Sequence, residues 1–550
     1  MIILLLIALV FWAVVVTKYL LFWIFLWQLK EYRIDRMRAH FALPSSRSLL
    51  VNRRAVLLVL LAAGGSVAAL QVSQSFWYVG LVVAAILWYG FLAARTGEQI
   101  QNRVLKAPVF TLRALVTLGL AVVGYGVVTF AFLLLARDWL LPWFFVSDLL
   151  VPIMATLGVF LFAPVARYLK RRTLARAKAK RAGLDRLLVI GITGSYGKTS
   201  MKEFLATILS QNFNVLKTEE NNNTDIGVAR TILNGLSKEH DIFVAEMGAY
   251  KKGEIARTAE IAQPSIGIIT GLAPQHLALF GSFQNIQEAK YELIEALPEK
   301  GLAVFNGDNE HVRAMFRQCE RPKRLYSAAG NNKKFGDGIM VESVRQTSDG
   351  MELSIREGSM RATLRTSLLG KHNVTNLVGA ITVARSLGME YEDIKAGVEA
   401  IVPPPHALTT HRGIKESTVI DDTYTANMTG VLAALDVLAA APARQKIFIM
   451  QPLIEMGPLA EKAHREIGAR IGEVCDWCIV TSEDYYQSMY KEALEGGMAP
   501  EAMVAIPSPR AALRKAQEVV DSGDVILLEG RVPEELLRGL VIHTSVPDER

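Results

Sequence analysis

The stretch LLVIGITGSYGKTS, residues 187–200, decides the fold of the larger part of this chain. Its first seven residues form a short apolar run that is typical of a buried strand, and KTSMKEFLATIL (198–209) follows as a helix. Glycine and other small residues fill the turn between them. A strand, a glycine-rich turn and a helix in this order predict an α/β fold with a phosphate-binding loop after a parallel strand.

The glycine-rich turn offers the groups that phosphate oxygens require. Backbone N–H groups of such a turn gather around a phosphate, and the helix N-terminus adds its dipole. Lys198 is placed to reach the phosphates and Thr199 to bind magnesium. The first glycine, Gly191, stands one residue earlier than the usual pattern requires, and a purely structural turn is the alternative. The residues expected around the phosphates are Gly194, Ser195, Gly197, Lys198, Thr199 and Ser200.

The first 165 residues have a different character, because long apolar runs dominate them. The whole chain has 550 residues, of which 51% are hydrophobic. Each run approaches the roughly 20 residues that cross a bilayer as a helix. The first is too long in its apolar part, and lacks a small-residue cleavage site, for a removable signal peptide. Runs without amphipathic periodicity predict a transmembrane domain of about five helices over 1–170, at 3–27, 54–73, 76–94, 114–136 and 148–166.

The distribution of basic residues orients these helices. Lysine and arginine gather in 30–54, 95–113 and 167–181, whereas the other connecting turns hold almost none. Positive residues mark the cytoplasmic side, so the N-terminus is expected outside and everything after 167 inside. The sequence thus predicts a multi-pass protein of the inner, cytoplasmic membrane. The net charge of +7 comes from residues that flank the bilayer and contact lipid headgroups, so no nucleic-acid partner is expected.

The remainder of the chain divides into two α/β regions. Strands are expected at 187–193, 241–248, 265–271 and 303–309, a β-hairpin with an Asp349-Gly350 turn within 339–366, and helix over 376–400. VPPPH (402–406) marks a linker, and further strands are expected at 417–422, 445–450, 475–482 and 524–530. The predicted fold class is a membrane α-helical domain followed by α/β, with a central P-loop domain at 183–402 and a smaller Rossmann-like domain at 403–550.

Several longer motifs narrow the chemistry. TEENNNTDIGVART (218–231), VAEMG (244–248), GLAPQH (271–276), LLGKHNVTNLVGAI (368–381) and IDDTYTAN (420–427) together resemble the Mur ligases. The likeness is closest to the branch that adds D-alanyl-D-alanine to a peptidoglycan precursor. It covers about 186–530 and does not reach 1–170. It implies a Mur-ligase fold and an enzyme that moves the γ-phosphoryl of ATP to a carboxylate, after which an amine displaces the phosphate and leaves an amide.

The resemblance also implies individual roles. It implies that Lys198, Lys290 and His276 are catalytic, and that ATP and Mg²⁺ are the cofactors. Lys290, in EAKYE (288–292), stands where the family has a carbamylated lysine, which would act as a carboxylate-like ligand. The implied metal ligands are Thr199, Glu246, His276 and Lys290. The implied nucleotide contacts outside the glycine turn are Asn223, His372, Asn373, Asn376, Arg412, Asp422, Tyr424 and Asn427.

Departures from the family pattern concentrate in the last domain. Thr425 replaces an asparagine, Gln451 and Pro452 stand in a usually different turn, and Glu529 replaces a lysine. The small domain that grips the uridine nucleotide of the acceptor is absent, and a membrane domain stands in its place. The expected partners are therefore an envelope precursor, lipid-linked or UDP-linked, an amino acid or short peptide as amine donor, and the lipid bilayer.

One alternative is a ligase that carries out the reaction of this branch on a soluble UDP-linked muramyl peptide, with the membrane part serving only as an anchor. Two alternatives to an active ligase also stay open. One is a transporter driven by a cytoplasmic ATPase domain, which the absence of an LSGGQ motif disfavours. The other is a degenerate ligase that serves as a scaffold, which the retained Lys198, Glu246 and Lys290 disfavour. Cys475 and Cys478 form a C-x-x-C on an apolar strand without a second pair, which favours a structural role over zinc or redox chemistry.

Overall fold

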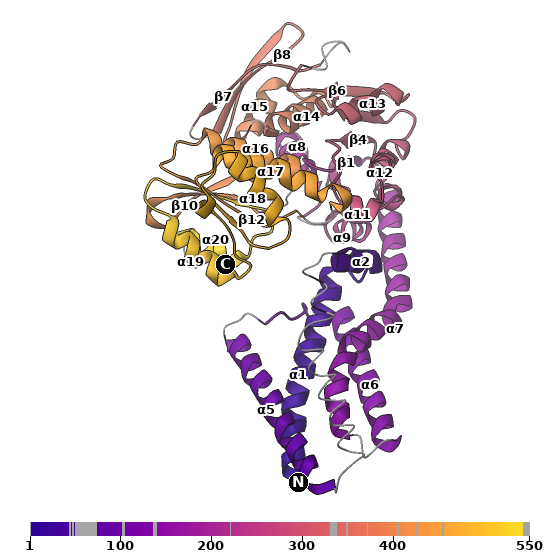
Figure 1. Cartoon of the computed structure of the whole chain (residues 1–550). Coiled ribbons are helices and arrows are strands. Elements are labelled where there is room, and N and C mark those ends of the chain that lie inside the picture. Colours follow the sequence, from indigo (N-terminus) through magenta and orange to yellow (C-terminus); the bar gives the residue numbers. More distant parts are fainter. Residues whose placement is uncertain are drawn as a thin grey trace. The chain divides into compact units, whose positions relative to one another are not determined.

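The computed structural model describes residues 2–42, 46, 49, 74–101, 105–135, 140–219, 222–330, 338–347, 350–370, 372–403, 406–423, 427–453 and 456–542 (Figure 1). Its internal contacts divide the chain into one unit over Met1–Arg171 and a second over Arg172–Arg550.

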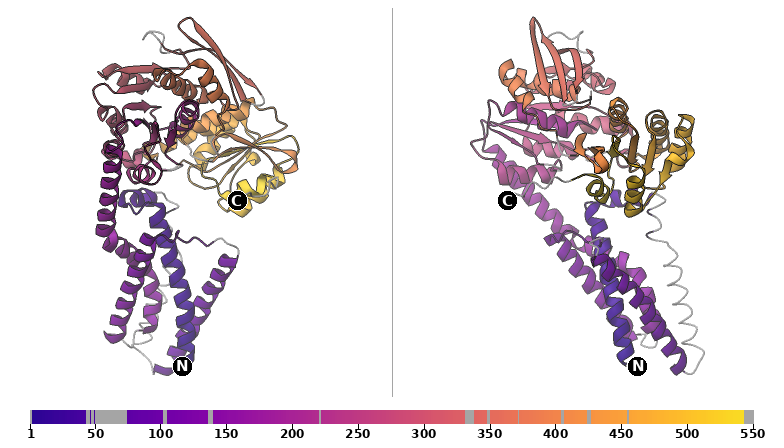
Figure 2. Two further views of the ribbon diagram at one scale, coloured as in Figure 1. Left: turned by 180° about the vertical axis from the view of Figure 1, so that it is seen from behind. Right: turned by 90° about the vertical axis from the view of Figure 1, so that its left-hand side faces the viewer.

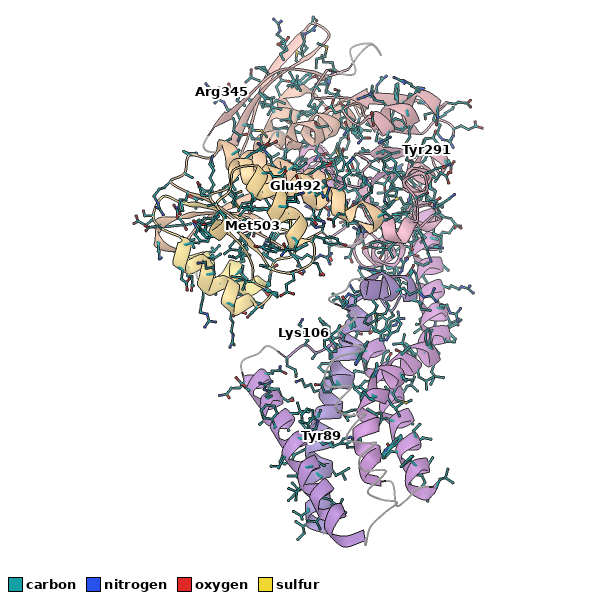
Figure 3. The ribbon with its side chains drawn as sticks, in the orientation of Figure 1. Tyr89, Lys106, Tyr291, Arg345, Glu492 and Met503 are labelled. Atoms are coloured by element: carbon teal, nitrogen blue, oxygen red, sulfur yellow. The ribbon has the colours of Figure 1, made fainter. Side chains whose placement is uncertain are left out.

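The first unit is helical. Its helices are α1 (Ile2–Leu29), α2 (Ile34–Ala42), α5 (Gln74–Gln101), α6 (Leu112–Leu135) and α7 (Leu140–Ala182), and the last continues into the second unit. Buried apolar residues such as Val15 and Ile24 on α1 and Tyr89 on α5 hold the bundle together (Figure 3). Many other apolar side chains, among them Leu87 and Phe130, are exposed, as expected of a surface that faces lipid.

Three helices of the described residues are long and apolar enough to cross a membrane. They cover Ile3–Leu29, Leu112–Phe132 and Ser147–Ala182, and correspond to the first, fourth and fifth predicted runs. The third run lies in α5, which is not among the three; the side chains of 74–78 and 81, at the start of this helix, lie outside the described residues. The second run, 54–73, lies outside the described residues. The described part therefore supports three of the five predicted spans.

The end of α7 is part of the core of the second unit. Ala177 is fully buried there beside Leu174. The guanidinium of Arg181 donates to the carbonyl oxygens of Ala262 (3.1 Å), Leu184 (3.0 Å) and Leu187 (3.2 Å). Because strand β1 begins at Leu188, only a short turn separates this anchored helix end from the glycine-rich loop.

The middle domain is built on a parallel sheet in the order β2-β3-β1-β4-β5-β6 (Figure 2). Its strands are β1 (Leu188–Thr193), β2 (Val215–Lys217), β3 (Ile242–Glu246), β4 (Ile266–Ile269), β5 (Leu302–Asn306) and β6 (Lys323–Tyr326). The core on one side of the sheet is completed by α8 (Lys198–Leu209), α14 (His372–Ser386) and α15 (Tyr391–Glu399). The other core is completed by α9 (Asp225–Gly235), α10 (Glu254–Ala262), α12 (Phe283–Glu295) and α13 (Glu310–Gln318).

The predicted α/β pattern of this domain is confirmed, with three differences of detail. The four predicted strands correspond to β1, β3, β4 and β5, whereas the short strands β2 and β6 were not predicted. The expected hairpin is a three-stranded antiparallel sheet of β7 (Met340–Thr347), β8 (Gly350–Glu357) and β9 (Met360–Thr366). The helical stretch 376–400 is interrupted, since α14 ends before Gly388 at a φ of 83°.

The C-terminal domain has a second six-stranded sheet, in the order β10-β11-β15-β12-β13-β14, of which only β10 is antiparallel. The strands are β10 (Thr409–Arg412), β11 (Thr418–Asp422), β12 (Lys446–Met450), β13 (Trp477–Val480), β14 (Met503–Ala505) and β15 (Val525–Glu529). The helices are α16 (Met428–Ala440), α17 (Ala460–Val474), α18 (Tyr486–Glu495), α19 (Pro509–Val519) and α20 (Glu534–Leu540). Cys475 and Cys478 are buried, and burial raises the pKa of both thiols, so neither is an activated nucleophile.

Replacing Arg181 is expected to loosen the end of α7. Arg181→Ala leaves three backbone carbonyls without their charged donor, which costs about 2–4 kcal/mol of unfolding free energy in the second unit. Chemical denaturation of the full chain in detergent measures this cost. Arg176→Ala, an exposed position on the same helix, is the control. Equal stability of the two variants would show that the anchor contributes nothing.

Candidate active site

The glycine-rich loop between β1 and α8 has a geometry that only glycine allows at two positions. Gly197 has a φ of 75°, and a side chain there would place its Cβ 2.7 Å from Oδ1 of Asn376. A Cβ on Gly194 would lie 2.1 Å from Oγ1 of Thr270. The backbone of this loop therefore approaches its neighbours so closely that a side chain at either position would clash with them.

The segment that follows β4 holds this loop in place. The amide N–H of Ser195 donates to the carbonyl oxygen of Gly271 (2.6 Å), and its hydroxyl donates to that of Ala273 (3.0 Å). The hydroxyl of Thr270 donates to the carbonyl oxygen of Tyr196 (2.5 Å). Ser195 was predicted to contact the phosphates, and in the structure both its donors maintain the shape of the loop.

Glu246 is the charged centre of the site. Its carboxylate lies at the end of β3 and is only 3% exposed. It accepts hydrogen bonds from the hydroxyl of Thr199 (2.9 Å) and the side-chain amide of Asn223 (3.0 Å). Lys202, which is fully buried, lies 3.7 Å from it. Three predicted residues, Thr199, Asn223 and Glu246, thus meet through hydrogen bonds at the carboxyl edge of the sheet.

Lys198 and Lys290 bring positive charge to the same place. Burial lowers the pKa of the Lys198 amine, and the charge of Glu246 opposes that effect. Lys290 projects from α12, which packs against β1 and β4 (Figure 1). Burial, and then the nearby charge of Lys198, lower the pKa of Lys290 to about 7. A large fraction of Lys290 is therefore neutral and nucleophilic near neutral pH.

The metal ligands are only partly assembled by protein groups. Among the described residues, no three His, Cys, Asp or Glu side chains lie close enough together to hold a metal ion. His276 begins the short helix α11 (Leu277–Phe280) at a φ of 55°, and its ring lies 4.9 Å from that of Tyr250. The Thr199 hydroxyl and the Glu246 carboxylate are nevertheless a donor pair that suits Mg²⁺, which binds one or two carboxylates and takes its other ligands from water and phosphate. A site that also used His276 would need a further carboxylate-like group.

The start of α14 adds the amides that follow His372, whose side chain lies outside the described residues. Asn376 faces Gly197, and Asn373 donates to the carbonyl oxygen of Leu369 (2.8 Å). Sequence reasoning missed Asp308, which follows β5. Asp308 accepts from the amide of Ala328 (2.8 Å) and the hydroxyl of Thr375 (3.2 Å), and so ties α14 to the sheet edge. Only the GDN turn after a strand could have indicated it.

The predicted residues of the C-terminal domain lie at the ends of its strands. Arg412 is an exposed residue that ends β10, and Asp422 ends β11. Asn427 caps α16 by accepting from the amide of Gly430 (3.0 Å), and Tyr424 lies outside the described residues. Asp421 is fully buried against His406, whose Nδ1 lies 2.6 Å from its carboxylate.

Comparison with known proteins agrees with this geometry. Residues 192–384 match the Mur ligase middle domain, and residues 408–532 match the Mur ligase glutamate ligase domain, which is the C-terminal one. These matches span both sheets and the whole glycine-rich loop from Ile192 onward.

The chain belongs to the Mur ligase family.

Its relatives include UDP-N-acetylmuramoyl-tripeptide–D-alanyl-D-alanine ligases. The one from Synechocystis is 34% identical over 310 residues, which are 56% of this chain and 65% of the relative. The one from Escherichia coli is 34% identical over 281 residues, 51% of this chain and 61% of the relative. The chain thus spans somewhat less than two thirds of these relatives.

Solved structures confirm the fold of the second unit. A crystal structure of MurF from Acinetobacter baumannii has a TM-score of 0.59 at 27% identity, over 67% of this chain and 80% of that one. MurF from Thermotoga maritima, in complex with ADP, has a TM-score of 0.59 at 24% identity, over 67% and 83% of the two chains. The Mur-ligase fold predicted for both α/β domains is therefore confirmed.

One feature of this Mur ligase is a buried pair of carboxyl groups. Asp422 and Glu529 lie opposite each other on the adjacent parallel strands β11 and β15, and Glu529 is fully buried. Burial raises the pKa of Glu529 well above its ordinary value, and the Asp422 charge raises it further. Burial likewise raises the pKa of Asp422 to about 7. The raised pKa values favour the protonated form of these two carboxyl groups.

This carboxyl pair should make the C-terminal domain less stable as the pH rises. Both groups have folded-state pKa values above those of the unfolded chain. Their stabilising contribution is therefore complete below the unfolded-state pKa values and is lost as the pH rises through the folded-state ones, which for Asp422 is about 7. In that pH range, each group lowers the free energy of unfolding by up to about 1.4 kcal/mol per pH unit.

Glu529→Gln keeps a neutral side chain of similar shape and is expected to flatten the decline in unfolding free energy between about pH 5 and pH 9. Denaturation of the full chain at several pH values measures the slope. The exposed Glu483→Gln is the control and should leave the slope unchanged. A wild-type slope that Glu529→Gln does not alter would contradict a protonated pair.

Proposed function

We propose that this protein is a membrane-anchored, ATP-dependent carboxylate–amine ligase of the Mur type that acts on a cell-envelope precursor. The observation that carries this proposal is the cluster of Lys198, Thr199, Asn223 and Glu246 around a loop whose backbone approaches its neighbours closely enough to exclude side chains. An oxygen of the acceptor carboxylate attacks the γ-phosphorus of ATP, and ADP leaves. The amine then attacks the acyl carbon, phosphate leaves and the amine loses a proton, so that an amide remains.

The residues of the site suit the charge that this reaction develops. Lys198 and the N-terminus of α8 favour the negative oxygens of the transferred phosphoryl group. Thr199 and Glu246 would hold Mg²⁺, which neutralises phosphate charge when it is bound. Because Glu246 is already oriented by Asn223, it needs no rearrangement to present one oxygen to a cation.

Lys290 is proposed to carry a carbamate. Its neutral amine attacks CO₂, a new N–C bond forms, and one proton is released to solvent. The product is an anionic carboxylate-like group beside Lys198. Two observations support this: burial disfavours the ammonium form of Lys290, and Lys198 stabilises a negative charge in that place. The carbamate would supply the further oxygen ligand that a metal ion held by Glu246 and His276 would need.

The membrane part is proposed to bring a lipid-linked acceptor to the ligase. The relatives are named for a UDP-linked muramoyl tripeptide and D-alanyl-D-alanine, and the match to the family models begins at residue 192. The helix α7 passes from an apolar segment directly into the core of the ATP-binding unit. A multi-pass anchor in the cytoplasmic membrane with the ligase on the cytoplasmic side agrees with the basic residues that follow the last span.

A ligation assay tests the function. The full chain in lipid nanodiscs receives ATP, Mg²⁺, UDP-linked and lipid-linked muramoyl peptides, and a set of amino acids and dipeptides, and product masses are read together with ADP. Lys198→Ala is expected to lower turnover by at least a hundredfold, because Lys202 is already engaged with Glu203 and Glu246. Lys238→Ala, an exposed lysine, is the control. Equal turnover of the two variants would show that this site takes no part in catalysis.

Lys290→Ala is expected to lower turnover about a hundredfold or more, since it removes a charged ligand from a buried site. Short carboxylates such as acetate or propionate are expected to restore part of the activity. Depleting CO₂ should lower the activity of the wild-type protein and leave Lys290→Ala unchanged. The exposed Lys300→Ala is the control. Full activity of Lys290→Ala without additives would refute the carbamate.

A further inference from the structure

The described residues of the first unit enclose an apolar groove. Two adjoining cavities of about 430 and 310 Å³ lie between α1, α2 and α7. Both are lined by Trp27, Met37, Phe41 and Thr156, so they form one continuous track. The track lies wholly within Met1–Arg171, at the end of α1 where α2 begins (Figure 1).

Most of the residues that line the track are apolar, and several of them are aromatic. The rings of Trp27 and Phe160 are 6.1 Å apart, as are those of Trp23 and Phe41. The indole N–H of Trp27 donates to the hydroxyl of Thr156 (3.1 Å) across the track. Since these polar atoms are satisfied by each other, the track offers a hydrocarbon surface, on which a hydrocarbon chain loses no hydrogen bonds.

One cation lies at the rim of the track. Arg38 lines the larger cavity and is exposed. Its neighbours on the same helix are engaged, Arg33 with Asp35 at 2.7 Å and Arg36 with Glu31 at 2.5 Å. Within the described part of the chain, no carboxylate pairs with Arg38. The guanidinium is therefore available to an anion, and a phosphate is the anion whose geometry it matches best.

We propose that this track binds the acceptor of the ligase by its lipid part, with a single hydrocarbon chain in the groove and the phosphate next to it on Arg38. A single track favours one chain per headgroup over a two-chain phospholipid. The inference rests on the proposed function, in which the acceptor is lipid-linked. It adds the place where that acceptor is held: α2 with its flanking parts of α1 and α7.

A photolabelling experiment tests binding independently of catalysis. The full chain in nanodiscs is exposed to a long single-chain alkyl phosphate that carries a diazirine, and labelled peptides are mapped. Labelling of α1, α2 and α7 that unlabelled single-chain phosphate displaces, but phosphatidylglycerol does not, is expected. Equal displacement by both lipids would show that the groove binds any bilayer lipid without selectivity, which would overturn the proposal.

Two substitutions link the groove to turnover. Arg38→Glu and the groove-filling Met37→Trp should raise the KM for a lipid-linked acceptor about tenfold, with kcat and the KM for ATP nearly unchanged, and should weaken the photolabelling. Lys106→Glu, an exposed basic position in the same unit, is the charge-matched control (Figure 3). An unchanged KM in both groove variants would overturn the proposal.

The outcomes also separate this inference from the proposed function. Specific labelling of the groove without any ligation of a lipid-linked acceptor would support the lipid site in the groove and refute the proposed acceptor. Ligation of a lipid-linked acceptor without labelling of the groove would support the proposed acceptor and refute the lipid site in the groove. If Arg38→Glu slows a water-soluble acceptor as strongly as a lipid-linked one, the residue acts on the fold and the proposal fails.

Discussion

The buried carboxylate of Glu246 is the constraint on which the ligase site depends. A carboxylate removed from water needs hydrogen-bond donors and nearby positive charge. Those come from Thr199 at the start of α8, Asn223 after β2 and the buried Lys202. The sheet order β2-β3-β1 brings exactly these segments to the end of β3, so the electrostatic balance of one side chain and the topology of the sheet support each other.

Much of the fold could be predicted because the central strands of this sheet are buried. Buried strands such as β1 and β3 are continuous apolar runs, and a run followed by a glycine turn and a helix has few other solutions. The short edge strands β2 and β6 gave no such pattern, since VLK and KRLY mix polar and apolar residues. Their place depends on neighbouring strands, which local sequence does not contain.

The candidate site, too, was predicted only in part. Thr199 follows the glycine-rich loop after β1 and Glu246 ends β3, and both strands are continuous apolar runs, so the sequence could indicate that the two residues meet at one edge of the sheet. Asp308 escaped prediction because its contacts, to Ala328 and Thr375, join segments far apart in the sequence. The loss of charge at Asp422 and Glu529 was equally hidden, since it requires knowing that two strands place these groups directly opposite each other.

The two catalytic domains differ in how they treat charge, and this bears on what the chain has kept from its family. The middle domain retains buried charges in balance, with Glu246 compensated by lysine and by neutral donors. The C-terminal domain instead buries Glu529 opposite Asp422, and burial raises the pKa of both carboxyl groups. In the proposed function, phosphoryl transfer would use the first arrangement, whereas the second lies in the other domain. A change confined to the carboxyl pair would leave the arrangement around Glu246 as it is, because the two lie on different sheets.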